Sequence, residues 1–162
     1  MFVEMDHVDN TMRSLEEARL AAQLAAEAFF CGVPVEEMAV VAPFRAQGRL
    51  IRQYLQEIAR EQDTPALTRI VVDTVERIQG QERDLVILSL VTSDVSFAAE
   101  RADFYFQPNR LNVAITRARK KRIILGNPLL FETQPLDPAL LTWVHLFRNL
   151  YEQSTVVREV KS

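Results

Sequence analysis

The stretch "VDTVERIQGQERDLVILSL", from Val72 to Leu90, begins and ends with apolar runs that are typical of buried strands. Its second run, from Asp84 to Val91, is the longest in the chain and predicts a central strand. Between the runs lies a polar, glycine-broken segment that includes Glu76, Gly80 and Glu82. In a parallel sheet, ligands bind outside the carboxyl ends of the strands, so we expect Thr74, Gln79, Gly80 and Glu82 to face a ligand at that edge. A solvated loop whose charges avoid the core explains the segment equally well.

Apolar runs and helical patterns alternate on both sides of this stretch. We expect strands at residues 2–5, 38–43, 69–73, 84–91 and 122–127, and helices at residues 14–30, 47–61, 109–119 and 137–150. Residues 92–108 show no period and predict a polar loop. Such an alternation predicts one α/β domain over residues 1–153, with a mostly parallel sheet covered by helices on both faces and a frayed tail at residues 154–162.

Length and composition narrow the function classes. The chain has 162 residues, a formal net charge of −3 and no apolar run long enough for a membrane span or a signal peptide. The lone Cys31 fits a reducing, cytoplasmic compartment and predicts a buried, small apolar role. One cysteine and two distant histidines give no zinc-site spacing, so we expect no metal site.

A local basic cluster contrasts with the acidic average. The segment "NRLNVAITRARKKR", residues 109–122, contains arginines and lysines but no acid, which favours an anionic partner. For Lys120, Lys121 and Arg122 we favour the explanation of a solvated helix end, where cations interact with the negative end of the helix dipole. Arg117 follows a mostly apolar helical pattern, and we expect it to point into the interior or a cleft, where its planar fork suits phosphate oxygens.

Phosphate-binding machinery is incomplete in this sequence. The pattern G-x-x-x-x-G-K-[ST] is absent, and no predicted strand ends in the paired acids that a magnesium site requires. If the chain handles a nucleotide, we therefore expect it to supply only part of the site.

Three segments in order resemble motifs IV, V and VI of superfamily 1 helicases: "VAPFRAQ" at residues 41–47, the opening stretch, and "NRLNVAITRARKKRIILGN" at residues 109–127. They are most similar to the branch that holds the nonsense-mediated-decay RNA helicase and the Okazaki-fragment helicase-nuclease. The resemblance covers nearly the whole chain and implies the second, C-terminal RecA-like domain of such an enzyme. The chain departs from the common motif V at Glu76, Ile78 and Gln81, where aspartate, phenylalanine and arginine are usual.

The resemblance implies nucleotide-binding roles for residues of motifs V and VI. Arg117 matches the arginine finger that reaches the γ-phosphate, and Glu82 matches the acid that binds the ribose. Gln79 and Gly80 match positions that couple the nucleotide to the strand-binding surface. ATP with Mg²⁺ is then expected as the cofactor, bound mainly by a first RecA-like domain that this sequence does not contain. Arg119 also matches the motif, but a salt bridge within the domain explains it equally well.

The resemblance also implies a track for single-stranded nucleic acid. Thr74 matches a position whose hydroxyl contacts a strand phosphate, and Pro43, Phe44 and Gln47 fall in the motif that lines the track. Phe44 could stack on a base or serve as a core aromatic. Phosphate and stacking contacts serve both DNA and RNA, and of the two we expect DNA.

Two further function classes remain open at this stage. A helicase-like domain can be retained as a non-catalytic module that binds nucleic acid or protein. A free-standing nucleotide-binding enzyme is disfavoured by the absent phosphate loop. The expected partners of the motor domain are single-stranded nucleic acid and the first RecA-like domain, without a membrane.

Overall fold

A six-stranded parallel sheet forms the centre of the computed structural model, which describes residues 1–78 and 80–158. The strand order is β3-β2-β4-β5-β1-β6, and each neighbouring pair is parallel. The strands are β1 (Phe2–Glu4), β2 (Met38–Ala42), β3 (Val71–Thr74), β4 (Arg83–Ser89), β5 (Ala118–Gly126) and β6 (Val156–Arg158). The prediction of an α/β domain with a parallel central sheet is confirmed.

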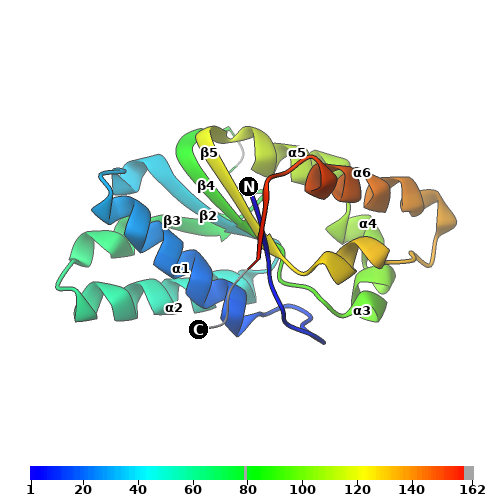
Figure 1. Cartoon of the computed structure of the whole chain (residues 1–162), viewed down its shortest axis with the longest axis horizontal. Helices are drawn as coiled ribbons and strands as arrows, with labels where there is room; N and C mark the ends of the chain where they lie inside the picture. The colour runs from blue at the N-terminus through cyan, green and yellow to red at the C-terminus, as the bar shows by residue number, and fades with distance from the viewer. Residues whose placement is uncertain (79, 159–162) are drawn as a thin grey trace.

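Helices cover both faces of the sheet. They are α1 (Leu15–Phe30), α2 (Arg45–Glu61), α3 (Val95–Glu100), α4 (Ala102–Tyr105), α5 (Pro108–Thr116) and α6 (Leu141–Glu152), with 3₁₀ turns η1 (Val35–Glu37), η2 (Pro65–Arg69), η3 (Pro128–Glu132) and η4 (Pro138–Leu140). Figure 1 shows α1 and α2 on one side of the sheet and α3 to α6 on the other. Two separate apolar cores, one on each face, follow from this arrangement.

Helix α1 illustrates how local sequence sets an element. Ser14 is its N-cap, because the Ser14 Oγ accepts a hydrogen bond of 3.1 Å from the backbone N–H of Glu17. Small alanines on its inner side are fully buried and allow the helix to lie close to the sheet. Gly32 follows the helix with a φ of +99°, a left-handed conformation that glycine adopts without strain.

The segment expected to be a loop, residues 92–108, contains the short helices α3 and α4. Helices this short give no readable sequence period. The next helix, α5, ends at Thr116, and strand β5 begins at Ala118. The basic run from Arg119 to Arg122 therefore lies on strand β5. The interpretation that Lys120, Lys121 and Arg122 form a solvated helix end is wrong.

Two further expectations, for the C-terminal tail and for Cys31, are also wrong. Strand β6 pairs with β1, so the tail is part of the sheet at least to Arg158 instead of frayed from residue 154. Cys31 is exposed at the C-cap of α1 instead of buried. In the described part of the chain, no helix is long and apolar enough to cross a membrane.

The sheet has two functional edges. We call the edge where the strands begin the amino edge, and the edge where they end the carboxyl edge. Residues 75–82, named here the crossing segment, run from the carboxyl end of β3 to the amino end of β4. Because β3 and β4 both run parallel to β2, this segment returns from one edge of the sheet to the other. It passes over β2, and its Val75 and Ile78 are buried in the core under α5 and α6. Its two ends consequently lie at opposite edges.

Candidate nucleotide and nucleic-acid sites

The amino edge brings together the predicted nucleotide-binding residues of motifs V and VI. Arg83 lies opposite Ala118 in the pairing of β4 with β5, and its backbone N–H donates to the Arg117 carbonyl over 2.9 Å. Glu82 and Arg117, the residues just before these two strands, are therefore neighbours. Our expectation that Glu82 faces the carboxyl edge together with Thr74 is wrong, because the crossing segment carries it to the other edge.

Arg117 has an unsatisfied hydrogen-bond donor at this edge. It is the C-cap of α5, its side chain is half-buried, and its Nε is buried without a hydrogen-bond partner among the described residues. The Nε of the adjacent Arg83 is in the same state. Buried donors without partners are uncommon in folded proteins and destabilising. A half-buried guanidinium at this edge is suited to an anionic group, such as the phosphates of a nucleotide.

Glu82 and Gly80 complete the amino edge. Glu82 is exposed, so its carboxylate is available to a polar ligand. Gly80 has a φ of +81°, and a Cβ at this position would meet no atom within 4 Å. The glycine is therefore required by the backbone conformation and leaves open space beside the chain. Gln79, predicted to act here, lies outside the described residues.

Two other cations of the basic cluster, Arg119 and Lys120, are paired within the domain. Arg119 donates from Nε to Asp84 over 3.0 Å and also pairs with Glu37, and Lys120 lies 2.7 Å from Asp84. The hydrogen bond from Lys120, followed by that from Arg119, lowers the pKa of Asp84 from its ordinary value. For Arg119 the interpretation as a salt bridge within the domain is thus confirmed.

The carboxyl edge has a pocket rich in arginine beside Thr74. The pairing of Ala42 with Thr74 brings the end of β3 next to the start of α2. A cavity of about 260 Å³ opens there, and we name it the arginine pocket. It is lined by Phe44, Arg45, Gly48, Arg49, Arg52, Asp73, Thr74 and Arg77.

The arginine pocket carries a net positive charge, because four arginines line it. Asp73 is its lining acid, and it accepts from the Thr74 N–H over 2.8 Å and lies 3.9 Å from Arg77. Arg45 and Arg49 are exposed and form no ion pair with any of the described residues. They also stand at the start of α2, where the helix dipole favours anions. The pocket is suited to phosphate groups.

The sequence reasoning missed these arginines, although a signal was present. Arg45, Arg49 and Arg52 follow Phe44 at the spacing that places side chains on one face of a helix. We expected the helix to begin at Gln47, which left Arg45 outside it. The helix begins at Arg45 instead.

Motif IV residues divide between the surface and the core. Phe44 lies at the rim of the arginine pocket, with its ring stacked on Phe104 at 5.7 Å and 28°. Gln47 is fully buried, and its amide bonds both the N–H and the carbonyl of Ser14 and the hydroxyl of Ser89. The prediction that Gln47 contacts single-stranded nucleic acid is therefore wrong, because its hydrogen-bonding groups bind other residues inside the domain.

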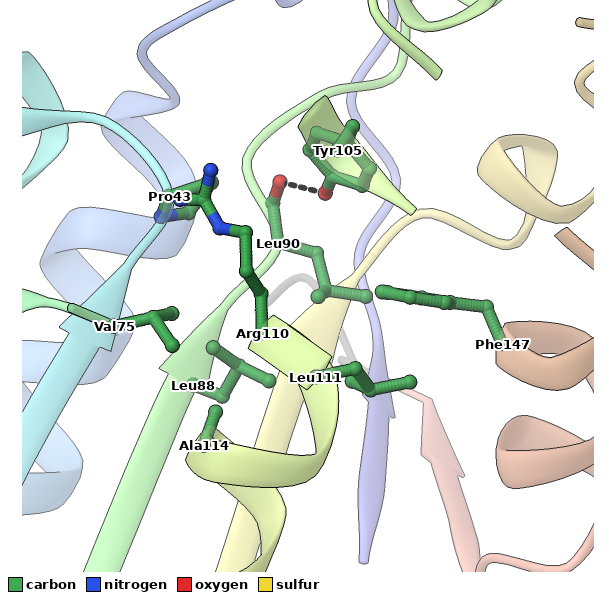
Figure 2. A pocket seen from close by; sticks show the side chains of 9 residues that line it. All are labelled: Pro43, Val75, Leu88, Leu90, Tyr105, Arg110, Leu111, Ala114 and Phe147. Atoms are coloured by element: carbon green, nitrogen blue, oxygen red, sulfur yellow. Dashed lines mark hydrogen bonds between the residues drawn. The ribbon is translucent and has the colours of Figure 1, made fainter. Parts of the chain in front are cut away.

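Pro43 lies beside a second, apolar pocket, shown in Figure 2. That pocket also contacts Val75, Leu88, Leu90, Tyr105, Arg110, Leu111, Ala114 and Phe147. Its volume is about 30 Å³, which leaves space for little more than a water molecule. It is too small for a nucleotide or a base, so the arginine pocket and the amino edge remain the candidate sites.

The parallel sheet, its helical layers and the incomplete anion site define an α/β domain of the RecA-like class. A family profile described as an AAA domain matches residues 3–129. The chain belongs to this family and, within it, to the superfamily 1 helicases of the nonsense-mediated-decay branch.

Individual relatives agree with this assignment. The chain is 32% identical to "ATP-dependent helicase NAM7" of Saccharomyces cerevisiae over 87% of its own length and 14% of the relative. It is 30% identical to "Putative regulator of nonsense transcripts 1" of Takifugu rubripes, over 87% of this chain and 12% of the relative. With "DNA polymerase alpha-associated DNA helicase A" of Saccharomyces cerevisiae it shares 36% identity, over 59% and 13% of the two chains. The chain thus spans about a seventh or less of these relatives.

Proposed function

We propose that this chain is the second RecA-like motor domain of an ATP-dependent helicase or translocase that moves along single-stranded nucleic acid. The observation that carries the proposal is the buried Nε of Arg117, which has no hydrogen-bond partner among residues 1–78 and 80–158 and lies beside Glu82, in a sequence without a phosphate loop. A site of this kind is completed when another domain presents the phosphates.

At the amino edge, Arg117 would act as the arginine finger. Its planar guanidinium would neutralise charge on the transferring phosphoryl oxygens, and a finger of this kind is worth about 10³–10⁵ in rate. Glu82 would accept hydrogen bonds from the ribose hydroxyls. The Mg²⁺ that accompanies ATP would be held mainly by the first RecA-like domain, where it offsets phosphate charge.

At the carboxyl edge, the arginine pocket would hold the strand backbone. Arg45 and Arg49 would contact phosphates, and the Thr74 hydroxyl would donate to one of them. Backbone contacts of this type carry no sequence information and weaken steeply as salt rises. The pocket would bind the phosphates of DNA and RNA alike, so both single-stranded DNA and single-stranded RNA are candidate substrates.

Stepping would follow from the separation of the two sites. Arg117 and Glu82 gain partners only when ATP lies between two domains, so ATP binding favours a closed cleft. Hydrolysis removes the γ-phosphate and releases that attraction. The arginine pocket and the first domain would bind the nucleic-acid strand in turn. Opening and closing of the cleft would then move the protein along the strand.

The test is strand-stimulated ATP turnover in the full-length protein that carries this domain. Arg117→Ala should lower turnover at least about a hundredfold, given the range for arginine fingers, because the phosphoryl charge loses its partner. Single-strand affinity should change little, since Arg117 lies at the other edge. Arg117→Lys should restore only part of the activity, because a point charge lacks the planar fork.

Arg148→Ala is the matched control. Arg148 is an exposed arginine on α6 that lies 3.9 Å from Glu152, so its removal changes charge without touching either edge. Turnover of Arg117→Ala equal to that of the control would contradict the arginine-finger role. A wild-type protein that binds single strands but shows no turnover would instead favour a non-catalytic interaction module.

A further inference from the structure

Helix α5 connects the two edges of the sheet. Arg110, in its first turn, lies at the apolar pocket beside Pro43 and Val75, near the carboxyl edge (Figure 2). Arg117, the C-cap of the same helix, lies at the amino edge. The two arginines are thus about 10 Å apart along one rigid helix.

Arg110 makes two contacts near the carboxyl edge. Its Nη2 lies 2.8 Å from Glu76 Oε1, and its guanidinium lies 3.7 Å from the centre of the Phe104 ring. Phe104 in turn stacks on Phe44, which lines the arginine pocket. The side chain of Arg110 is only 14% exposed, so these contacts fix its position.

Glu76 links Arg110 on α5 to the crossing segment. It belongs to the crossing segment, which starts after Thr74 in the arginine pocket and ends with Glu82 at the amino edge. The Arg110–Glu76 ion pair therefore joins the two segments that run between the edges. A displacement of Thr74 or Phe44 by a bound strand would act on this pair from both sides.

We propose that Arg110, through Glu76 and Phe104, is a positioning residue that couples strand occupancy of the arginine pocket to the placement of Arg117 and Glu82. The inference rests on the proposed motor function and adds a coupling element to it. Arg110 is not among the residues that line the arginine pocket.

The exposure of Glu76 argues for coupling over simple stability. Its side chain is 55% exposed, so solvent screens its charge and its share of the pair contributes little to folding, whereas Arg110 is 14% exposed and packs on the Phe104 ring. The ion pair instead fixes the relative position of α5 and the crossing segment, which is what transmission between the edges requires. Loss of the ion pair should therefore lower the stimulation of ATP turnover by the nucleic-acid strand, while basal ATP turnover stays the same.

The experiment compares Arg110→Gln, Glu76→Gln and the double variant in the full-length protein. The readout is the ratio of ATP turnover with a saturating single-stranded oligonucleotide to turnover without it, measured with a deoxythymidine and a uridine oligomer of equal length. Each single variant should lower this ratio about tenfold, within the usual range for coupling between two sites. Basal turnover should stay close to wild type in both, and of the two only Arg110→Gln, which also loses its contact with the Phe104 ring, should lower the melting temperature slightly.

The double variant and a conservative variant identify the pair as the cause. Since both single variants break the same contact, the double variant should be no worse than the more severe single one. Arg110→Lys should restore part of the ratio, because it keeps a cation near Glu76 and over the Phe104 ring. Arg148→Gln, with the same charge change in an exposed pair on α6, should keep the wild-type ratio.

Four outcomes would overturn the inference. Additive effects of the two single variants would show that Arg110 and Glu76 act separately. A parallel fall in basal turnover, stimulated turnover and melting temperature would show a merely structural role. An unchanged ratio in both variants would show no coupling through the pair, while strand-stimulated turnover of the wild type would keep the proposed function intact. If the wild type shows no stimulated turnover at all, both proposals fail.

Discussion

At the residue scale, Tyr105 places a phenolic hydroxyl inside the apolar core. Its O–H donates to the Leu90 carbonyl at the end of β4, as the dashed line in Figure 2 shows. Burial, followed by the negative charge of Glu17, raises the pKa of Tyr105 well above its ordinary value. The folded protein therefore holds this proton more tightly than the unfolded chain does.

This shift predicts a loss of stability in alkaline solution. Above pH of about 10, the unfolded chain releases the tyrosine proton while the folded protein keeps it, so the free energy of unfolding should fall as pH rises. Tyr105→Phe should reduce that slope, and should cost about 1–3 kcal/mol at neutral pH because the Leu90 carbonyl loses its donor. Urea unfolding at a series of pH values measures both effects. Tyr54→Phe is the control, and an equal slope in wild type and Tyr105→Phe would contradict the assignment.

Single residues differ in how far sequence alone could place them. Arg117 was expected to point into the interior or a cleft, because it follows the apolar side of a helix, and its Nε is indeed buried. Gln47 was expected on the strand track, but it bonds Ser14 and Ser89, which are distant in sequence. Hydrogen bonds between such distant residues leave no local pattern, so sequence could not reveal them.

At the element scale, the crossing segment is the connection on which both sites depend. The sequence predicted its flanking strands well, because both are continuous apolar runs. Because β3 and β4 run parallel, the segment must pass from the carboxyl edge to the amino edge, a consequence of the predicted parallel sheet that our expectation for Glu82 did not take into account. The sequence did not indicate that β2 lies between β3 and β4. Strand order is a non-local property, and the same holds for β6, whose three residues are assigned by pairing with β1.

The two ends of the crossing segment should act on different ligands. Thr74→Ala removes one hydroxyl from the arginine pocket, a contact to a charged group worth about 1.5–3 kcal/mol, and should weaken single-strand binding. Glu82→Gln keeps the side-chain shape but removes its charge at the amino edge. It should raise the Michaelis constant for ATP, while strand affinity without nucleotide stays the same.

Strand-binding anisotropy and ATP titration at fixed salt separate these effects in the full-length protein. Thr68→Ala serves as the control, because Thr68 is an exposed threonine on η2 whose hydroxyl donates to the nearby Pro65 carbonyl. Equal loss of strand binding in Thr74→Ala and Glu82→Gln, or equal loss of ATP affinity, would mean that the segment forms one site.

At the scale of the whole molecule, the domain has two edges with different chemistry. The carboxyl edge holds a cluster of arginines at a helix start, and the amino edge holds unpaired arginine donors beside an exposed acid. Neither edge contains a phosphate loop. The relatives, of which this chain spans a seventh or less, are long enough to contain the other half of such a site.

This division predicts that the 162-residue chain will not hydrolyse ATP by itself. Arg117 and Glu82 can stabilise charge and bind ribose, but the sequence has no loop that cradles the β- and γ-phosphates, so affinity for ATP should also be poor. The chain should still bind single-stranded oligonucleotides through the arginine pocket, more weakly as salt rises. Phosphate release and anisotropy, measured on one preparation free of contaminating ATPases, test both statements. Strand-stimulated ATP hydrolysis by wild type that disappears in Arg117→Ala would contradict the half-site interpretation, because the chain would then contain a complete catalytic site.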